Sequence, residues 1–362
     1  MTFEIRGGVR AAALPGATPF ARQSARLLGD LRLRDADPAF IQARAQQEEA
    51  DGCDSALVTL YSAWPDPWLV ASWALASTER LCITLAHRPG VTQPTVAARA
   101  LATLDRLSGG RVAVHIVMGS SDADVQRDGD FLGKAARYQR AVEYLEVFTR
   151  TLAGHEPFDY RGEHYQVVDA GSGVLPVQRP HPPISIGGTS PQARQLAARF
   201  ADIYAGGFPT PEVTREVIAE VSALAAGHGR QLRFWKDFKV ILGSSDSEAE
   251  QRAQRLRTEA EAQLQARSLG ALASSPQIAR DRERASQSTR DPQALRDWVL
   301  AETRQAFEGV LVGSVATVAE RLLAFHRAGI DIVQIEASTE DEEDSGLRRQ
   351  LIAHLRKVAG DG

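Results

Sequence analysis

One stretch of the chain, from Leu81 to Ser120, restricts the possible folds more than any other. It begins with Leu81–Ala86 and ends near Val112–Met118, two apolar runs typical of strands buried on both faces. Between them, Pro94 suits the first position of a helix, and Gly109-Gly110 suits a left-handed helix stop. The apolar residues expected to form one stripe along this helix are Val96, Ala97, Ala100, Leu101, Leu104 and Leu107. A strand, a helix and a strand joined by short loops predict a parallel pair with a right-handed crossover.

The same alternation continues along the chain. Eight strands are expected, at residues 3–5, 55–61, 81–86, 112–118, 183–186, 203–205, 232–242 and 330–335. Further helices are expected at residues 39–50, 67–78, 137–152, 191–200, 211–226, 317–328 and 347–358, with another starting at residue 247. A small hairpin is expected around Arg161-Gly162. This order predicts an α/β fold, a (β/α)8 TIM barrel with insertions, as a single domain over residues 1–362. An open doubly wound sheet is the alternative, but its GxGxxG fingerprint is missing from the sequence.

Composition narrows the possible functions. Hydrophobic residues make up 43% and charged residues 24%, with a net charge of −4, so neither nucleic acid nor an anionic membrane surface is an expected partner. The N-terminus carries Glu4 and Arg6 where a signal peptide would be apolar, which favours a cytoplasmic protein. Cys53 and Cys82 lie near apolar runs and are expected to be buried thiols. The eight histidines form no HxH or HExxH pattern, so no metal site is expected.

The segment RPGVTQPTVAARALATLDRLSGGR, residues 88–111, resembles the luciferase-like flavin-dependent monooxygenases, in particular the alkanesulfonate monooxygenase branch. The resemblance also implies a barrel. It further implies a two-component enzyme that takes reduced FMN from a separate flavin reductase and uses O2 to oxygenate a small organic molecule. A sulfonate, a sulfone or another heteroatom compound would be the substrate. Members of the family often form homodimers or homotetramers.

Several residues are expected to bind the cofactor. After the strand at 183–186, a glycine pair and a helix start offer unpaired amides to a phosphate, although an ordinary capped turn has the same pattern. The resemblance implies an FMN phosphate site at Gly187, Gly188, Thr189 and Ser190. Tyr138 matches an Arg-Tyr pair of the family, and Ser120 follows the strand at 112–118. His115 stands where many relatives carry an asparagine that bonds the flavin ring; it could donate to a ring carbonyl and titrate near neutral pH, or be a satisfied core histidine.

The expected catalytic positions are less like those of the sulfonate branch. Arg304 matches the family's lid arginine, whereas Asp237 and Lys239 replace an arginine and a histidine. Trp64 stands in place of a cysteine, and Ser338 in place of a tyrosine. The resemblance places a mobile lid at about residues 268–297. Arg304 and Lys239 are expected to stabilise a peroxyflavin or an oxyanion. Asp237 opposes an anion unless it is paired, and Trp64 fills space or stacks on the substrate.

These observations leave three hypotheses open. The first is the FMN-dependent monooxygenase. The second is a deazaflavin-dependent oxidoreductase of the same superfamily, which would transfer a hydride without oxygen. The third, suggested by the altered catalytic positions, is a barrel that binds flavin or a partner without catalysis.

Overall fold

The computed structural model describes residues 3–29, 35–119, 121–154, 156–269 and 292–360. At its centre, eight parallel strands form a ring. In order around the ring, they are β9 (Arg233–Gly243), β11 (Ile332–Glu336), β1 (Glu4–Gly8), β2 (Ser55–Val58), β3 (Cys82–His87), β4 (Val112–Ile116), β7 (Ile184–Gly187) and β8 (Ile203–Ala205). The pairing of β8 with β9, which sets Ala205 beside Trp235, closes the ring. The predicted (β/α)8 barrel is therefore confirmed.

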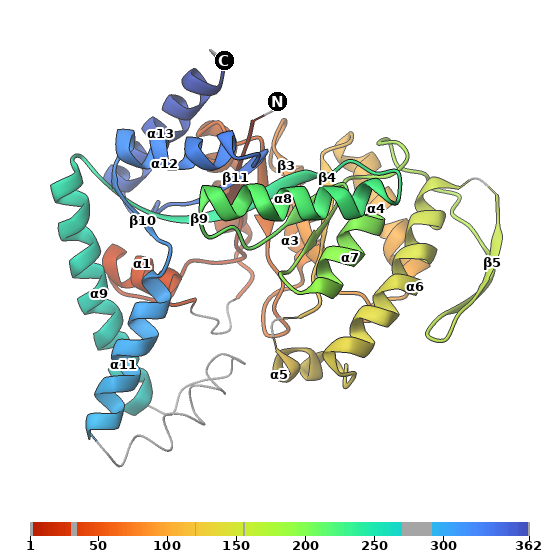
Figure 1. Ribbon diagram of the computed structural model, residues 1–362, viewed down its shortest axis with the longest axis horizontal. Helices are drawn as coiled ribbons and strands as arrows, with labels where there is room; N and C mark the ends of the chain where they lie inside the picture. The colour runs from red at the N-terminus through yellow and green to blue at the C-terminus, as the bar shows by residue number, and fades with distance from the viewer. Residues whose placement is uncertain (1–2, 30–34, 120, 155, 270–291, 361–362) are drawn as a thin grey trace.

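Strand β9 is long enough to leave the ring. Its residues 235–239 pair with β11, and its residues 240–243 pair with β10 (Leu311–Ser314). β10 is thus a ninth parallel strand outside the barrel. The segment between β9 and β11 is thereby anchored to the barrel wall on the side where α9 and α11 project (Figure 1).

Helices surround the ring (Figure 1). They are α1 (Pro19–Leu27), α2 (Pro38–Ala50), α3 (Pro67–Ala76), α4 (Pro94–Ser108), α5 (Asp122–Val125), α6 (Lys134–Ala153), α7 (Pro191–Phe200), α8 (Pro211–Ala226), α9 (Asp246–Leu269), α11 (Pro292–Phe307), α12 (Val315–Arg327) and α13 (Glu342–Gly360). Five of them, α1, α2, α3, α7 and α8, start with proline after a capping Asp, Ser or Thr side chain. The capping side chain accepts from an amide of the first helical turn, and proline, which has no N–H, leaves no unpaired amide at the first position. These two signals explain why most of these starts could be predicted from the sequence.

The apolar stripe predicted for α4 is partly wrong. Ala97, Leu101 and Leu104 are buried as expected, but Ala100 is exposed, Val96 is 44% exposed and Leu107 is 80% exposed. The buried face is completed instead by small residues, among them Ala98, Ala102 and Ser108. The wide stripe read from the sequence thus spans both the core face and part of the solvent face.

The barrel interior is closed below the rim by a polar plug. The buried guanidinium of Arg6 donates to Ser55 Oγ and to Glu4 Oε1, each at 2.9 Å. Its Cζ lies over the indole ring of Trp235, 4.3 Å from the ring centroid. Side chains from three strands thus fill the centre, which favours ligand entry from the C-terminal rim.

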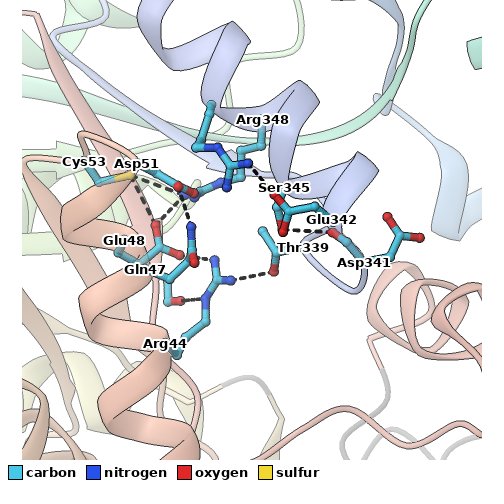
Figure 2. A network of polar contacts seen from close by, with 12 residues as sticks. Arg44, Gln47, Glu48, Asp51, Cys53, Thr339, Asp341, Glu342, Ser345 and Arg348 are labelled. Atoms are coloured by element: carbon cyan, nitrogen blue, oxygen red, sulfur yellow. Dashed lines mark hydrogen bonds and ion pairs between the residues drawn. The ribbon is translucent and has the colours of Figure 1, made fainter.

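A buried ion network joins α2 to α13 behind β1 (Figure 2). Arg348 of α13 forms ion pairs with Glu48 and Asp51, and Arg44 forms a second ion pair with Glu48. Gly7 makes room for this network, because a Cβ there would lie 1.8 Å from Glu48 Oε2. The network fixes α2, and with it Arg44, beside the C-terminal rim.

Other predictions have mixed outcomes. The small hairpin is confirmed as β5 (Phe158–Arg161) paired with β6 (Gln166–Ala170). Helix α1 was missed, because its segment is rich in glycine and proline, and so was the whole of α11, whose first residues lie inside the predicted lid. Residues 270–291, the greater part of that lid, lie outside the described residues, so the lid stays a prediction. Among the described residues, no helix combines the length and hydrophobicity required to span a bilayer.

Candidate active site at the C-terminal rim

A cavity of about 450 Å³, here called the rim cavity, opens at the C-terminal ends of β2, β3, β4 and β7. Its lining residues are Leu57, Thr59, Leu60, Tyr61, Ala86, Arg88, His115, Val117, Met118, Gly119, Lys134, Tyr138, Gly187, Gly188, Thr189 and Ser190. The fold therefore brings together six of the seven residues predicted to bind the cofactor. The seventh, Ser120, lies outside the described residues.

The turn from β7 into α7 presents backbone amides to this cavity. Ser190 caps the helix by accepting from Ala193 N–H, and Gly188 N–H donates to Ala205 O. Among the described residues, the amides of Thr189, Ser190 and Gln192 have no hydrogen-bond partner. Gly188 has φ +136°, and a Cβ there would approach Ala193 Cβ to 2.8 Å, so the turn requires glycine. The result is a helix N-terminus open to an anion.

His115 lies in the wall between β4 and β7. Its Nδ1 is 2.9 Å from Ser185 Oγ, and its ring lies edge-on to Trp235 at 4.7 Å between centroids. A Cβ on Gly187 would lie only 3.0 Å from its Cε1, so the glycine lets the imidazole reach the cavity. Burial, with a smaller contribution from the charge of Arg6, lowers the pKa of His115 to about 3. The imidazole is therefore neutral at physiological pH and does not titrate near neutrality, as the sequence had suggested it could.

Two side chains of α6 lie at the end of the cavity where the N-terminus of α7 is open to an anion. The Tyr138 hydroxyl lies 3.5 Å from Ser190 Oγ, and both residues line the cavity. Lys134 lies one helical turn earlier and lines the same wall. Sequence reasoning missed Lys134, although its spacing of four residues from Tyr138 places both on one helix face. Together with the α7 turn, they make this end of the cavity attractive to an anion.

An ion network holds the loop after β4 over the cavity. Arg88 is buried, and its guanidinium donates to Asp124 at 2.6 Å and to Asp128 at 2.7 Å. Arg137 donates to Asp122 at 2.9 Å rather than into the cavity. Of the Arg-Tyr pair expected from the sequence, the tyrosine thus lines the cavity, and the arginine anchors α5.

Trp64 lies in a neighbouring hollow. That hollow measures about 160 Å³ and shares Leu60, Tyr61, Ala86 and Arg88 with the rim cavity. The rings of Trp64 and Tyr61 are tilted at 5.1 Å between centroids. The indole is therefore next to the rim cavity without lining it.

The other three predicted catalytic residues line none of these described cavities. Asp237 is exposed on β9, and Lys239 donates from Nζ to Leu27 O at 3.2 Å. Arg304 is exposed in the last turn of α11. Their catalytic roles stay predictions. The described residues also include no cluster of three His, Cys, Asp or Glu that could hold a metal ion.

Comparison with models of known families identifies the family of the chain. A family model described as luciferase-like monooxygenase matches residues 16–331. The chain belongs to this family. The match covers the whole ring apart from β1 and β11, and it includes every residue that lines the rim cavity. The alkanesulfonate branch is not separated from the rest of the family by this match.

Solved structures give the same answer for the fold. EDTA monooxygenase from Chelativorans sp. BNC1 aligns with a TM-score of 0.73 at 18% identity, covering 99% of this chain and 95% of that one. A riboflavin lyase, solved with modified FMN and riboflavin, aligns with a TM-score of 0.76 at 17% identity, covering 99% and 92%. An F420-dependent secondary alcohol dehydrogenase aligns with a TM-score of 0.69 at 16% identity, covering 98% and 100%. At such identities, these likenesses establish the shared fold.

Proposed function

We propose that the protein is a two-component monooxygenase that binds reduced FMN in the rim cavity and oxygenates a small organic substrate with O2. A separate flavin reductase would supply the reduced FMN. The observation that carries this proposal is the open N-terminus of α7 beside Tyr138 and Lys134, at one end of a cavity of about 450 Å³. When bound, reduced FMN supplies the electrons that activate O2.

The residues present fit a flavin phosphate. The free amides of Thr189, Ser190 and Gln192 would donate to its oxygens, with the helix dipole favouring the negative charge. The Tyr138 hydroxyl and the Lys134 ammonium would bind from α6. The glycine backbone of the turn would allow the phosphate to approach closely, since a side chain at Gly188 has no space.

The other end of the cavity suits a flat, largely apolar ring. Ala86, Val117 and Met118 supply apolar walls, while His115 offers a single ring nitrogen. Because His115 Nδ1 is bonded to Ser185 Oγ, only Nε2 is left to contact a ring heteroatom. His115 would therefore orient the ring as a neutral hydrogen-bonding group rather than as an acid. The Arg6 and Trp235 plug beneath it would keep water from reaching the ring through the barrel.

Anaerobic titration of the purified full-length chain with reduced FMN tests the proposal. We expect binding in the micromolar range or tighter, and productive oxygen consumption only when a flavin reductase, NAD(P)H and a substrate are added. A matched reaction without the reductase serves as the control. Absence of saturable binding of reduced FMN at micromolar concentrations would contradict the proposal.

The similarity to an F420-dependent alcohol dehydrogenase supports a second candidate, hydride transfer with a deazaflavin. The phosphate end of the cavity could equally hold the phosphate of such a cofactor. Competition between F420 and FMN for the same protein separates the two. Displacement of FMN by equimolar F420, with oxygen-independent substrate oxidation, would favour the second candidate.

A further inference from the structure

A second hollow at the rim, here called the arginine cavity, lies at the C-terminal ends of β11, β1 and β2. It measures about 60 Å³, enough for one small charged group rather than for a flavin. Leu57 and Thr59 line both this hollow and the rim cavity, so the two are separated only by the end of β2. No role for the arginine cavity follows from the proposed flavin site.

Three arginines from three different segments line the arginine cavity. Arg10 follows β1, Arg26 lies in the last turn of α1, and Arg44 lies in α2. Arg44 is already bound, to Thr339 Oγ1 at 2.5 Å and to Glu48. Arg26 is only 9% exposed, and its Nη2 is buried with no hydrogen-bond partner among the described residues. Arg10 likewise has no ion-pair partner within the described part of the chain.

The carboxylates that line the same hollow do not cancel this charge. Glu48 and Asp51 behind it are neutralised together by Arg44 and Arg348. Glu340 is paired with Arg22 at 2.5 Å.

That leaves Arg10 and Arg26 facing the single carboxylate of Glu336, which accepts a hydrogen bond from Gln334 at 3.2 Å. One positive charge is in excess among the described residues. An unpaired buried cation is costly, so the site favours an incoming anion.

We propose that the arginine cavity binds the anionic group of the substrate, a carboxylate or a sulfonate, through the guanidinium groups of Arg26 and Arg10. Guanidinium groups present forked donors that match the paired oxygens of such groups. This inference rests on the proposed function, because it assigns the substrate class of the same rim. The substrate is then an organic anion whose charged group lies roughly 5–10 Å, one or two strand spacings, from the atom that reacts over the flavin.

A pair of isosteric probes tests the site without flavin. Methanesulfonate carries the anionic group, whereas dimethyl sulfone has nearly the same shape and no charge. Binding of each to the full-length, flavin-free protein is measured by ligand-observed NMR at constant ionic strength. We expect methanesulfonate to bind about tenfold or more tightly than the sulfone, and Arg26→Gln to remove that preference.

The variants keep the test decisive. Arg10→Gln should also weaken methanesulfonate binding, which covers the case in which Arg26→Gln does not fold. Arg26→Lys should retain part of the preference, because it keeps the charge and loses the fork. Arg327→Gln removes an exposed arginine of α12 and should bind like the wild type. Equal affinity for the two probes, or unchanged methanesulfonate binding by both Arg26→Gln and Arg10→Gln, would overturn the proposal.

Reduced FMN separates this inference from the proposed function. Arg26→Gln should bind reduced FMN within about twofold of the wild type, because Arg26 does not line the rim cavity. Equal affinity for the two probes in a wild-type protein that binds reduced FMN counts against the arginine cavity alone. A retained preference in a protein that binds no flavin counts against the monooxygenase and leaves the anion site standing.

Discussion

Two tyrosines of α6 offer a direct comparison between binding and stability. The Tyr138 hydroxyl faces the rim cavity, and its one described polar contact is a long one, 3.5 Å to Ser190 Oγ. The Tyr144 hydroxyl does not line this cavity and lies 2.6 Å from His87 Nε2. Tyr138→Phe and Tyr144→Phe remove the same atom from these two surroundings.

Tyr138→Phe is expected to weaken flavin binding more than it lowers stability, and Tyr144→Phe is expected to do the reverse. In the flavin-bound protein, Tyr138→Phe deletes a hydrogen bond to a charged phosphate, worth about 1.5–3 kcal/mol, which corresponds to roughly 10- to 150-fold weaker binding of reduced FMN. Its effect on the free energy of unfolding should stay below about 1 kcal/mol, because the lost contact is long. Tyr144→Phe leaves the buried His87 Nε2 without its partner and should cost about 1–3 kcal/mol of unfolding free energy.

Anaerobic flavin titration and urea unfolding of the flavin-free protein measure the two effects separately. Tyr144→Phe should bind reduced FMN like the wild type, because it does not line the rim cavity. The reasoning is refuted if Tyr138→Phe binds reduced FMN as tightly as the wild type. A similar loss of FMN affinity in both variants would also refute it, since that would point to a general effect on α6.

Three further predictions concern stability. Burial is the main cause that lowers the pKa of His87 to about 4 and that of His115 to about 3. Below pH 6.5 these two imidazoles are therefore protonated in the unfolded chain before they are protonated in the folded one. The free energy of unfolding should then fall by about 5 kcal/mol between pH 7 and pH 4.5, and a flat urea midpoint over this range would contradict it. Gly7→Ala should displace Glu48 from Arg348 and lower the free energy of unfolding in urea by about 3 kcal/mol or more. A loss below about 1 kcal/mol would contradict this prediction. Arg348→Met breaks the ion pair of the buried Asp51 and leaves Glu48 with Arg44, which should cost about 3–5 kcal/mol, whereas an unchanged melting temperature would exclude this role.

Much of the fold could be predicted because local signals and the barrel architecture agree. Proline after a capping side chain marks the starts of α7 and α8, and the predicted bounds Pro191–Phe200 and Pro211–Ala226 match the structure. Strand β10 could not be placed, since the partner that holds it is the unusual extension of β9 beyond the ring. Exposed Val96 and Leu107 show that apolar spacing alone does not tell which face of a wide stripe meets the core.

In the candidate site, too, some residues could be placed from the sequence and others could not. Residues near or directly after a strand end, such as His115 and Gly188, could be placed at the rim because parallel strands share one C-terminal edge. The role of Arg26 could not be predicted, because it depends on how α1 packs and on which carboxylates are already paired. The protonation state of His115 was open for the same reason, since burial rather than sequence sets it.

The central claim is that the N-terminus of α7, with Tyr138 and Lys134, holds the phosphate of a reduced flavin. Riboflavin has the same ring and ribityl chain as FMN and lacks only the phosphate. Under anaerobic conditions, the account predicts that reduced FMN binds about 100-fold or more tightly than reduced riboflavin. Equal affinity for the two reduced flavins would contradict it.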